Sequence, residues 1–153
     1  METVMSSDIS TPPTSTPPTP KKPTTVVYAC SGCSDAGEIA DRVARQLSSE
    51  GAAQMSCLAG IGGRVKNLLT TAEKAQRILV VDGCPLNCAR KTLELAGFNE
   101  FEHLELHKLG IRKGSAPVTS ERIAAGVEAA RTIISNPLLE ERPVAVLCPA
   151  KDK

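Results

Sequence analysis

An unbroken apolar run, Ile78 to Val81, is the feature that most constrains the fold of this chain. Four consecutive β-prone apolar residues are typical of a strand that is buried on both faces of a parallel sheet. The run leads directly into the sequence DGCPLNCARK, in which turn-forming and polar residues replace apolar ones. We therefore expect a central strand whose carboxyl end opens into a loop that carries two cysteines.

Three further segments have the composition of strands, and helical patterns separate them. The expected strands cover residues 26–29, 54–58 and 101–106, and the expected helices begin near Asp35, Val65, Pro85 and Ser120. Asp35 with Glu38 resembles a capping pair, and Gly97 suits the end of the third helix. Because strands alternate with helices, we expect an α/β fold, a three-layer and parallel or mostly parallel sheet of about four strands with helices on both faces.

The chain of 153 residues is long enough for one ordinary domain, which we expect at residues 25–136. Residues 1–24 are rich in Ser, Thr and Pro, a composition that buries too little apolar surface to fold. They are therefore expected to form a disordered or polyproline-like tail. Residues 137–153 are a C-terminal extension, in which the run from Val144 to Leu147 is either an added strand or a loosely docked end.

Charge and hydropathy exclude several classes of partner. The formal net charge is only +1, which gives no broad electrostatic footprint for nucleic acid or an anionic membrane. No apolar run reaches the roughly 18 residues that span a bilayer, and the first 25 residues of the sequence contain no secretory core. The protein is therefore expected in the cytoplasm, where its six cysteines are metal ligands or redox thiols rather than disulfides.

Four cysteines form two short pairs, Cys30 with Cys33 and Cys84 with Cys88. Each pair follows an expected strand, so both belong at the carboxyl ends of the strands, where open parallel sheets bind ligands. Zinc prefers four tetrahedral ligands with sulfur at about 2.3 Å, and each short spacing lets one loop supply two. Helix starts would add partial positive charge and free N–H groups that stabilise thiolates. We predict a zinc site formed by Cys30, Cys33, Cys84 and Cys88.

The other two cysteines are weaker candidates. Cys57, in MSCLAG, lies near the end of the second expected strand and would be an additional or alternative ligand, or a free thiol that faces the metal. A small buried hydrophobe is a competing interpretation for Cys148 and also for Cys57.

The segments YACSGCSDAGEIADRVARQL, MSCLAGIGG and DGCPLNCARKTLELAG resemble the DGC domain family, named after its central Asp-Gly-Cys motif. The resemblance covers about residues 27–134, and all the motif cysteines are present. It implies a domain described as zinc-binding because of its cysteines, without an assigned biochemical role.

Other polar groups receive structural interpretations. Asp82 precedes a glycine and is expected to serve the turn rather than catalysis. His103 and His107 are expected at exposed strand positions. The stretch Gly60 to Arg64 could offer N–H groups to an anion, but it lacks a full nucleotide-binding fingerprint, so a plain glycine-rich turn is preferred.

Three functions stay open at this point. The first is a zinc protein in which the metal locks the fold, is carried or is sensed. The second uses the same thiols in redox chemistry, sulfur transfer or an iron-sulfur cluster, which four cysteines also suit. The third is an adaptor that acts through the Pro-rich tail. The sequence names a metal ion as partner and leaves the protein partner, the substrate and enzyme status unassigned.

Overall fold

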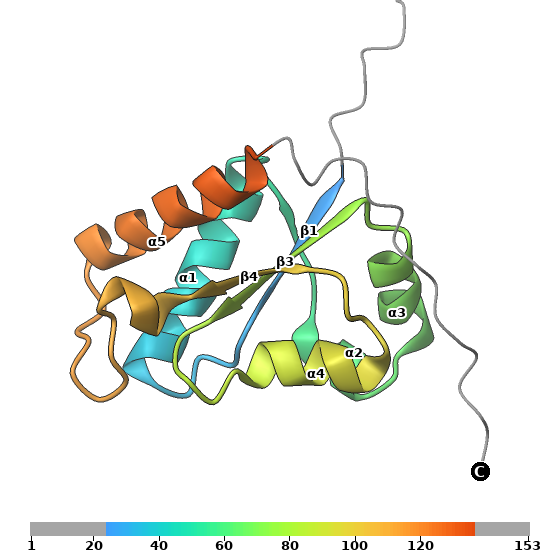
Figure 1. Ribbon diagram of the computed structural model, residues 1–153, viewed down its shortest axis with the longest axis horizontal. Helices are drawn as coiled ribbons and strands as arrows, with labels where there is room; N and C mark the ends of the chain where they lie inside the picture. Colours follow the sequence, from blue (N-terminus) through green and yellow to red (C-terminus); the bar gives the residue numbers. More distant parts are fainter. Residues whose placement is uncertain (1–23, 137–153) are drawn as a thin grey trace, which may run out of the picture.

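The computed structural model describes residues 24–136, which form a four-stranded sheet with helices on both faces (Figure 1). The strands run parallel in the order β2-β1-β3-β4. The elements are β1 (Thr25–Ala29), α1 (Asp35–Ser49), β2 (Gln54–Met55), α2 (Leu58–Gly62), α3 (Lys66–Glu73), β3 (Arg77–Asp82), α4 (Cys88–Ala96), β4 (Glu102–Glu105), the 3-10 helix η1 (Leu106–Leu109) and α5 (Ser120–Ile134). The expected three-layer parallel α/β fold is confirmed.

The helices divide between two layers. α1 and α5 pack against each other on one face of the sheet, and α2, α3 and α4 cover the other (Figure 1). β1 and β3 are neighbours, yet the helices that follow them, α1 and α4, lie on opposite faces. Open parallel sheets bind ligands at such a switch point, outside the carboxyl ends of the two strands. The fold therefore places a crevice after β1 and β3.

Aliphatic side chains of the central strands form the middle of the core. β1 and β3 are buried at every position, as the run from Ile78 to Val81 predicts. Helix α1 adds Ile39, Val43 and Leu47, all wholly buried at helical spacing. Small buried residues let the helices approach the sheet and each other closely: Ala36, Ala40 and Ala44 in α1, and Ala130 in α5.

The β2 edge differs from expectation. The expected strand at 54–58 is reduced to Gln54–Met55, because the chain leaves the sheet and α2 begins at Leu58. The glycine-rich stretch that follows was expected to be a plain turn, which is wrong, since it forms most of α2. Gly60 packs so closely on Leu68 that an added Cβ would lie 1.9 Å from the Leu68 Cδ1 atom. Glycine serves close packing here rather than a turn.

Two further boundaries shift. α4 begins at Cys88 rather than near Pro85, because Asn87 takes a left-handed conformation with φ of 51° just before it. The last expected strand, 101–106, ends at Glu105, where η1 takes over. The end of α4 is as predicted, since Gly97 has a φ of 96° and its N–H bonds the last turn of the helix.

Residues 1–23 and 137–153 lie outside the described residues. The expected tail, the C-terminal extension with its run from Val144 to Leu147, and Cys148 therefore stay predictions. Across residues 24–136, no helix combines the length and apolar character that a bilayer span requires.

Candidate functional site at the switch point

The carboxyl ends of β1 and β3 bring two cysteine-bearing loops into contact. Cys30 directly follows β1, and its N–H donates to the carbonyl oxygen of Val81 at 3.0 Å. The N–H of Gly83 in turn donates to the Cys30 Sγ atom at 3.3 Å. The first sulfur of one pair therefore touches the Asp-Gly-Cys motif that carries the other pair.

Gly83 fits between the two loops because it has no side chain. A Cβ at this position would lie 2.4 Å from the Ala36 carbonyl oxygen and 2.9 Å from the Gly37 nitrogen. Real Cβ atoms do not approach backbone this closely, so any other residue would push the loop after β3 away from the start of α1. The glycine of the motif thus sets the distance between the two cysteine loops.

Asp82 caps helix α4 from the end of β3. Its wholly buried carboxylate accepts hydrogen bonds from the N–H groups of Ala89 at 2.9 Å and Arg90 at 3.0 Å. Asn87, the residue in the cap position, makes no side-chain cap of its own. Asp82 therefore satisfies the free N–H groups at the start of α4, which a residue next to the helix usually does. Its negative charge also interacts favourably with the helix dipole.

The start of α1 is also capped by its own residues. Ser34 Oγ accepts from the Gly37 N–H at 3.1 Å, so Ser34 is the cap rather than the expected Asp35. Asp35 instead accepts from the N–H groups of Ala36, Gly114 and Ala116 and ties a distant loop to the helix. With α1 and α4 both capped by oxygen atoms, the helix starts offer the cysteines fewer free N–H groups than the sequence suggested. Within residues 24–136, the backbone N–H that donates to a sulfur is that of Gly83.

The two histidines are less exposed than expected. The His103 side chain is 14% exposed, and its Nε2 atom lies 3.0 Å from Asp82 Oδ2. His107 is also partly buried, with Nε2 3.9 Å from Glu105. Their interpretation as exposed strand positions is wrong, because the His103 ring contacts the buried Asp82 and His107 lies in η1 with its side chain 22% exposed. Asp82 consequently joins α4, β3 and β4 at one point.

Without a bound cation, the Cys30 thiol ionises with difficulty, because it is buried and its neighbours are negative. Burial raises the pKa of the Cys30 thiol to about 11; the Gly83 N–H opposes the rise, whereas Asp82, Cys84 and Cys88 add to it. At neutral pH this sulfur is therefore a protonated thiol in the structure described. The groups that raise its pKa are the ones whose charge a cation would offset.

The remaining predicted ligands are more open. Cys84 is half-buried after β3, whereas Cys88, the first residue of α4, and Cys33, in the loop after β1, are exposed. Within residues 24–136, no three His, Cys, Asp or Glu side chains stand together as a ready-made metal site. The fold therefore brings the two loops together without assembling the four sulfurs.

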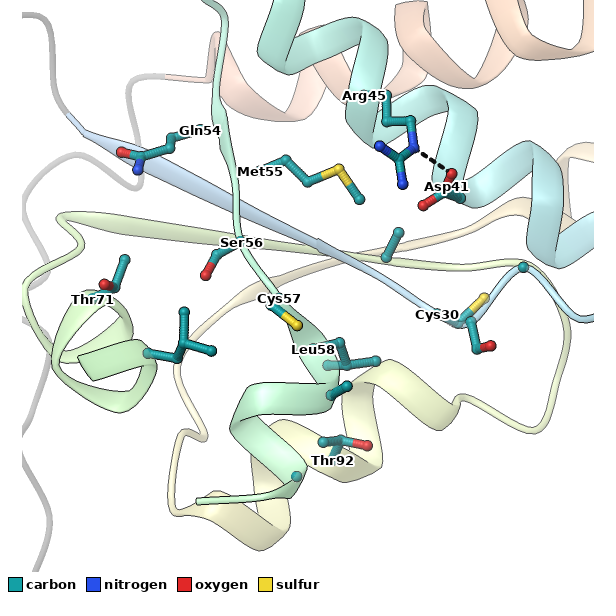
Figure 2. Close-up of a pocket in the computed structure, with 16 residues that line it drawn as sticks. Cys30, Asp41, Arg45, Gln54, Met55, Ser56, Cys57, Leu58, Thr71 and Thr92 are labelled. Atoms are coloured by element: carbon teal, nitrogen blue, oxygen red, sulfur yellow. Dashed lines mark hydrogen bonds and ion pairs between the residues drawn. The ribbon is translucent and has the colours of Figure 1, made fainter. Parts of the chain in front are cut away.

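Cys57 lies apart from the two pairs. It is an exposed residue at the carboxyl end of β2, just before α2. Together with Cys30, it lines a cavity of about 790 Å³ beside the β2 edge (Figure 2). The carboxyl ends of β2, β1 and β3 thus carry sulfur in a row, as the sequence suggested.

Sequence reasoning missed Asp82 and His103 as partners, and it missed the cavity. No signal for the Asp82 cap was present in the sequence, because Asn87, directly before α4, is itself a preferred cap residue and only the structure shows that its side chain does not cap the helix. The His103 contact depends on the register that places Val80 beside His103 in the sheet. That register follows from tertiary packing rather than from any local pattern.

Sequence comparison identifies a family and a relative of the chain. The DGC domain matches residues 26–130. The chain belongs to the DGC domain family. It is also similar to the "Anaerobic and virulence modulator AnvM" of Pseudomonas aeruginosa PAO1, with 41% identity over 88 residues that cover 58% of this chain and 67% of that protein. No solved structure matches the chain. In this member of the family, Asp82 caps a helix, Gly83 permits close approach and Cys84 follows at the switch point.

Proposed function

We propose that this DGC domain protein binds zinc through Cys30, Cys33, Cys84 and Cys88 at the switch point of the sheet, in the cytoplasm. The observation that carries the proposal is the contact between the Gly83 N–H and the Cys30 sulfur, which joins the two cysteine loops. Thiolates are preferred zinc ligands, and a reducing compartment keeps such thiols free to bind.

The electrostatics of Cys30 support a cation at this place. A thiol surrounded by burial, the Asp82 carboxylate and two further thiols resists ionisation without a counter-charge. A bound divalent cation reverses that preference and removes the thiol proton. The donor chemistry of the four cysteines fits zinc, and the exposed Cys33 and Cys88 have to turn toward Cys30 for the set to close.

The same thiol argues against Cys30 as a redox nucleophile. A dithiol enzyme attacks with a thiolate, and reactive cysteines have a lowered pKa. Burial shifts the pKa of Cys30 in the opposite direction, to about 11. In a Cys30–Cys33 dithiol the attacking thiol would therefore be the exposed Cys33, whereas an iron-sulfur cluster would use the same four ligands as zinc.

The name of the Pseudomonas relative describes a modulator. That word favours a binding or sensing role over catalysis for the zinc site of the present chain. We propose that the metal is sensed, or that it holds the two loops together so that their surface can be recognised.

Metal content tests the proposal. The full chain, purified without oxygen, is analysed for zinc and iron, together with serine variants of the four cysteines and of Cys57. We expect about one zinc ion per chain, lost in each of the four variants and kept in Cys57→Ser. A brown, iron-containing protein would replace zinc with a cluster. Metal-free protein with all thiols titratable would contradict metal binding altogether.

A further inference from the structure

The cavity beside β2 has walls from both helical layers (Figure 2). α1 contributes Asp41 and Arg45, the end of β2 contributes Met55 and Cys57, and α2, α3 and α4 complete the wall. Its volume of about 790 Å³ lies within the range of pockets that enclose small organic molecules. Most of the wall is apolar or carries small hydroxyl groups, so the chemistry comes from a thiol and one ion pair.

Cys57 is the accessible thiol of this wall. Its side chain makes no capping hydrogen bond to α2, and its sulfur points into the cavity in Figure 2. Cys30 also lines the cavity, but it is 9% exposed and accepts the Gly83 N–H. A ligand in the cavity therefore meets the sulfur of Cys57 first.

Asp41 and Arg45 supply opposite charges on the other side of the cavity. Arg45 Nε lies 2.6 Å from Asp41 Oδ2, and the Arg45 side chain is 66% exposed. Among the described residues that line the cavity, these two are the acidic and basic side chains. An exposed pair of this kind contributes little to stability, so a ligand can replace either partner at small cost. Such a pair matches a zwitterion, with a carboxylate toward Arg45 and an ammonium toward Asp41.

We infer that the cavity binds small disulfides that end in an α-amino acid group and that Cys57 exchanges with them. The Cys57 thiolate attacks one sulfur of the ligand, a new S–S bond forms, and the ligand's own S–S bond breaks. The departing half leaves as a thiolate and takes up the proton that Cys57 lost. Cys57 is oxidised to a mixed disulfide, and the departing half is reduced.

This site shares Cys30 with the proposed zinc ligands, but its reacting sulfur belongs to Cys57. Cys33, Cys84 and Cys88 do not line the cavity, and the reaction requires no metal. The assignment also separates Cys57 from its alternative role as a ligand. Zinc content and Cys57 modification therefore report on two different claims.

The test follows mixed-disulfide formation on the full chain as purified. Cystine, cystamine and dithiodiglycolate offer zwitterionic, cationic and anionic ends on comparable disulfides, and peptide mapping by mass spectrometry locates the adduct. We expect Cys57 to react with cystine at least about fivefold faster than with either charged analogue, the ratio that corresponds to about 1 kcal/mol. A methanethiosulfonate reagent without charge calibrates the intrinsic reactivity of each thiol.

Variants of Asp41 and Arg45 test whether this ion pair recognises the ligand. Arg45→Gln and Asp41→Asn should each reduce the cystine rate about fivefold while leaving the rate with the uncharged reagent unchanged. Arg42→Gln is the matched control, because Arg42 pairs with Glu38 on the same helix and does not line the cavity. Equal rates for all three probes, equal rates in all variants, or an adduct on another cysteine would overturn the inference. Loss of zinc from Cys57→Ser would also overturn it, whereas a zinc-free wild type would refute only the metal site.

Discussion

The Nε2 atom of His103 lies 3.0 Å from Oδ2 of Asp82, and this contact ties the edge strand β4 to the strand that ends at the candidate site. The same carboxylate caps α4, the helix that begins with Cys88. A single buried side chain therefore fixes the direction in which the second cysteine loop leaves the sheet.

Asp82→Asn should destabilise the domain. The amide keeps the shape of the carboxylate but places an NH₂ donor where an acceptor is needed, so in either orientation the N–H of Ala89 or of Arg90 loses its acceptor. We expect the free energy of unfolding in urea to fall by about 2–4 kcal/mol. Glu94→Gln, which disturbs only the exposed Arg90–Glu94 pair, is the control and should change it by less than about 0.5 kcal/mol. Equal effects would mean that Asp82 is not the cap.

Gly83→Ala should separate the two cysteine loops. The added Cβ would lie 2.4 Å from the Ala36 carbonyl oxygen, so the backbone has to move, and we expect a loss of about 1–3 kcal/mol together with weaker zinc binding. Gly62→Ala is the matched control, because the nearest atom to its Cβ is Thr92 Cγ2 at 3.5 Å and alanine favours the helix. A Gly83→Ala protein as stable as wild type would contradict the close approach.

Arg77→Met should destabilise the opposite end of the sheet and leave the cysteine loops intact. The buried guanidinium donates to the Ile133 and Ile134 carbonyl oxygens at the end of α5 and to Glu102 Oε1. Its removal leaves these acceptors without their donor, and we expect a loss of about 3–5 kcal/mol in urea unfolding. Arg42→Met removes only an exposed helix pair and should lose less than about 0.5 kcal/mol.

Asp35 should contribute stability that disappears in acid. Hydrogen bonds from the Gly114, Ala116 and Ala36 N–H groups hold the pKa of Asp35 below its ordinary value of 3.8. Because the folded pKa is lowered, the contribution is complete above 3.8 and is lost as the pH falls through the lower, folded pKa.

Amide NMR checks this prediction. The Gly114 and Ala116 amide shifts should follow the ionisation of Asp35 with a midpoint below 3.8, and Asp35→Asn should abolish that titration. A midpoint at or above 3.8 would show that the two N–H groups do not stabilise the carboxylate.

Local patterns predicted most of the fold. The apolar run from Ile78 to Val81 identified the central strand, and Ile39, Val43 and Leu47 identified the first helix, because burial imposes a period on both. The stretch after Cys57 was predicted wrongly, since its glycines resemble a turn, whereas Gly60 and Gly62 lie in α2 and Gly60 packs closely on Leu68. Helix propensity predicts local structure poorly where tertiary packing determines it.

The positions of the cysteine pairs after β1 and β3 were predicted, whereas their surroundings were not. Strand ends located the cysteine pairs, because parallel strands present their carboxyl ends on one edge. The burial of Cys30, the cap from Asp82 and the His103 contact depend on which strands are neighbours, and spacing in the sequence does not specify this. The cavity beside Cys57 depends on packing from both layers and had no signal in the sequence.

X-ray absorption at the zinc edge tests the central claim most directly. The claim is that the loops after β1 and β3 supply four sulfur ligands to one zinc ion. For the full chain with stoichiometric zinc, we predict a single shell of about four sulfur atoms at about 2.3 Å, and a loss of sulfur from that shell in Cys84→Ser. A shell dominated by nitrogen or oxygen, or a spectrum identical in wild type and Cys84→Ser, would contradict the four-cysteine site.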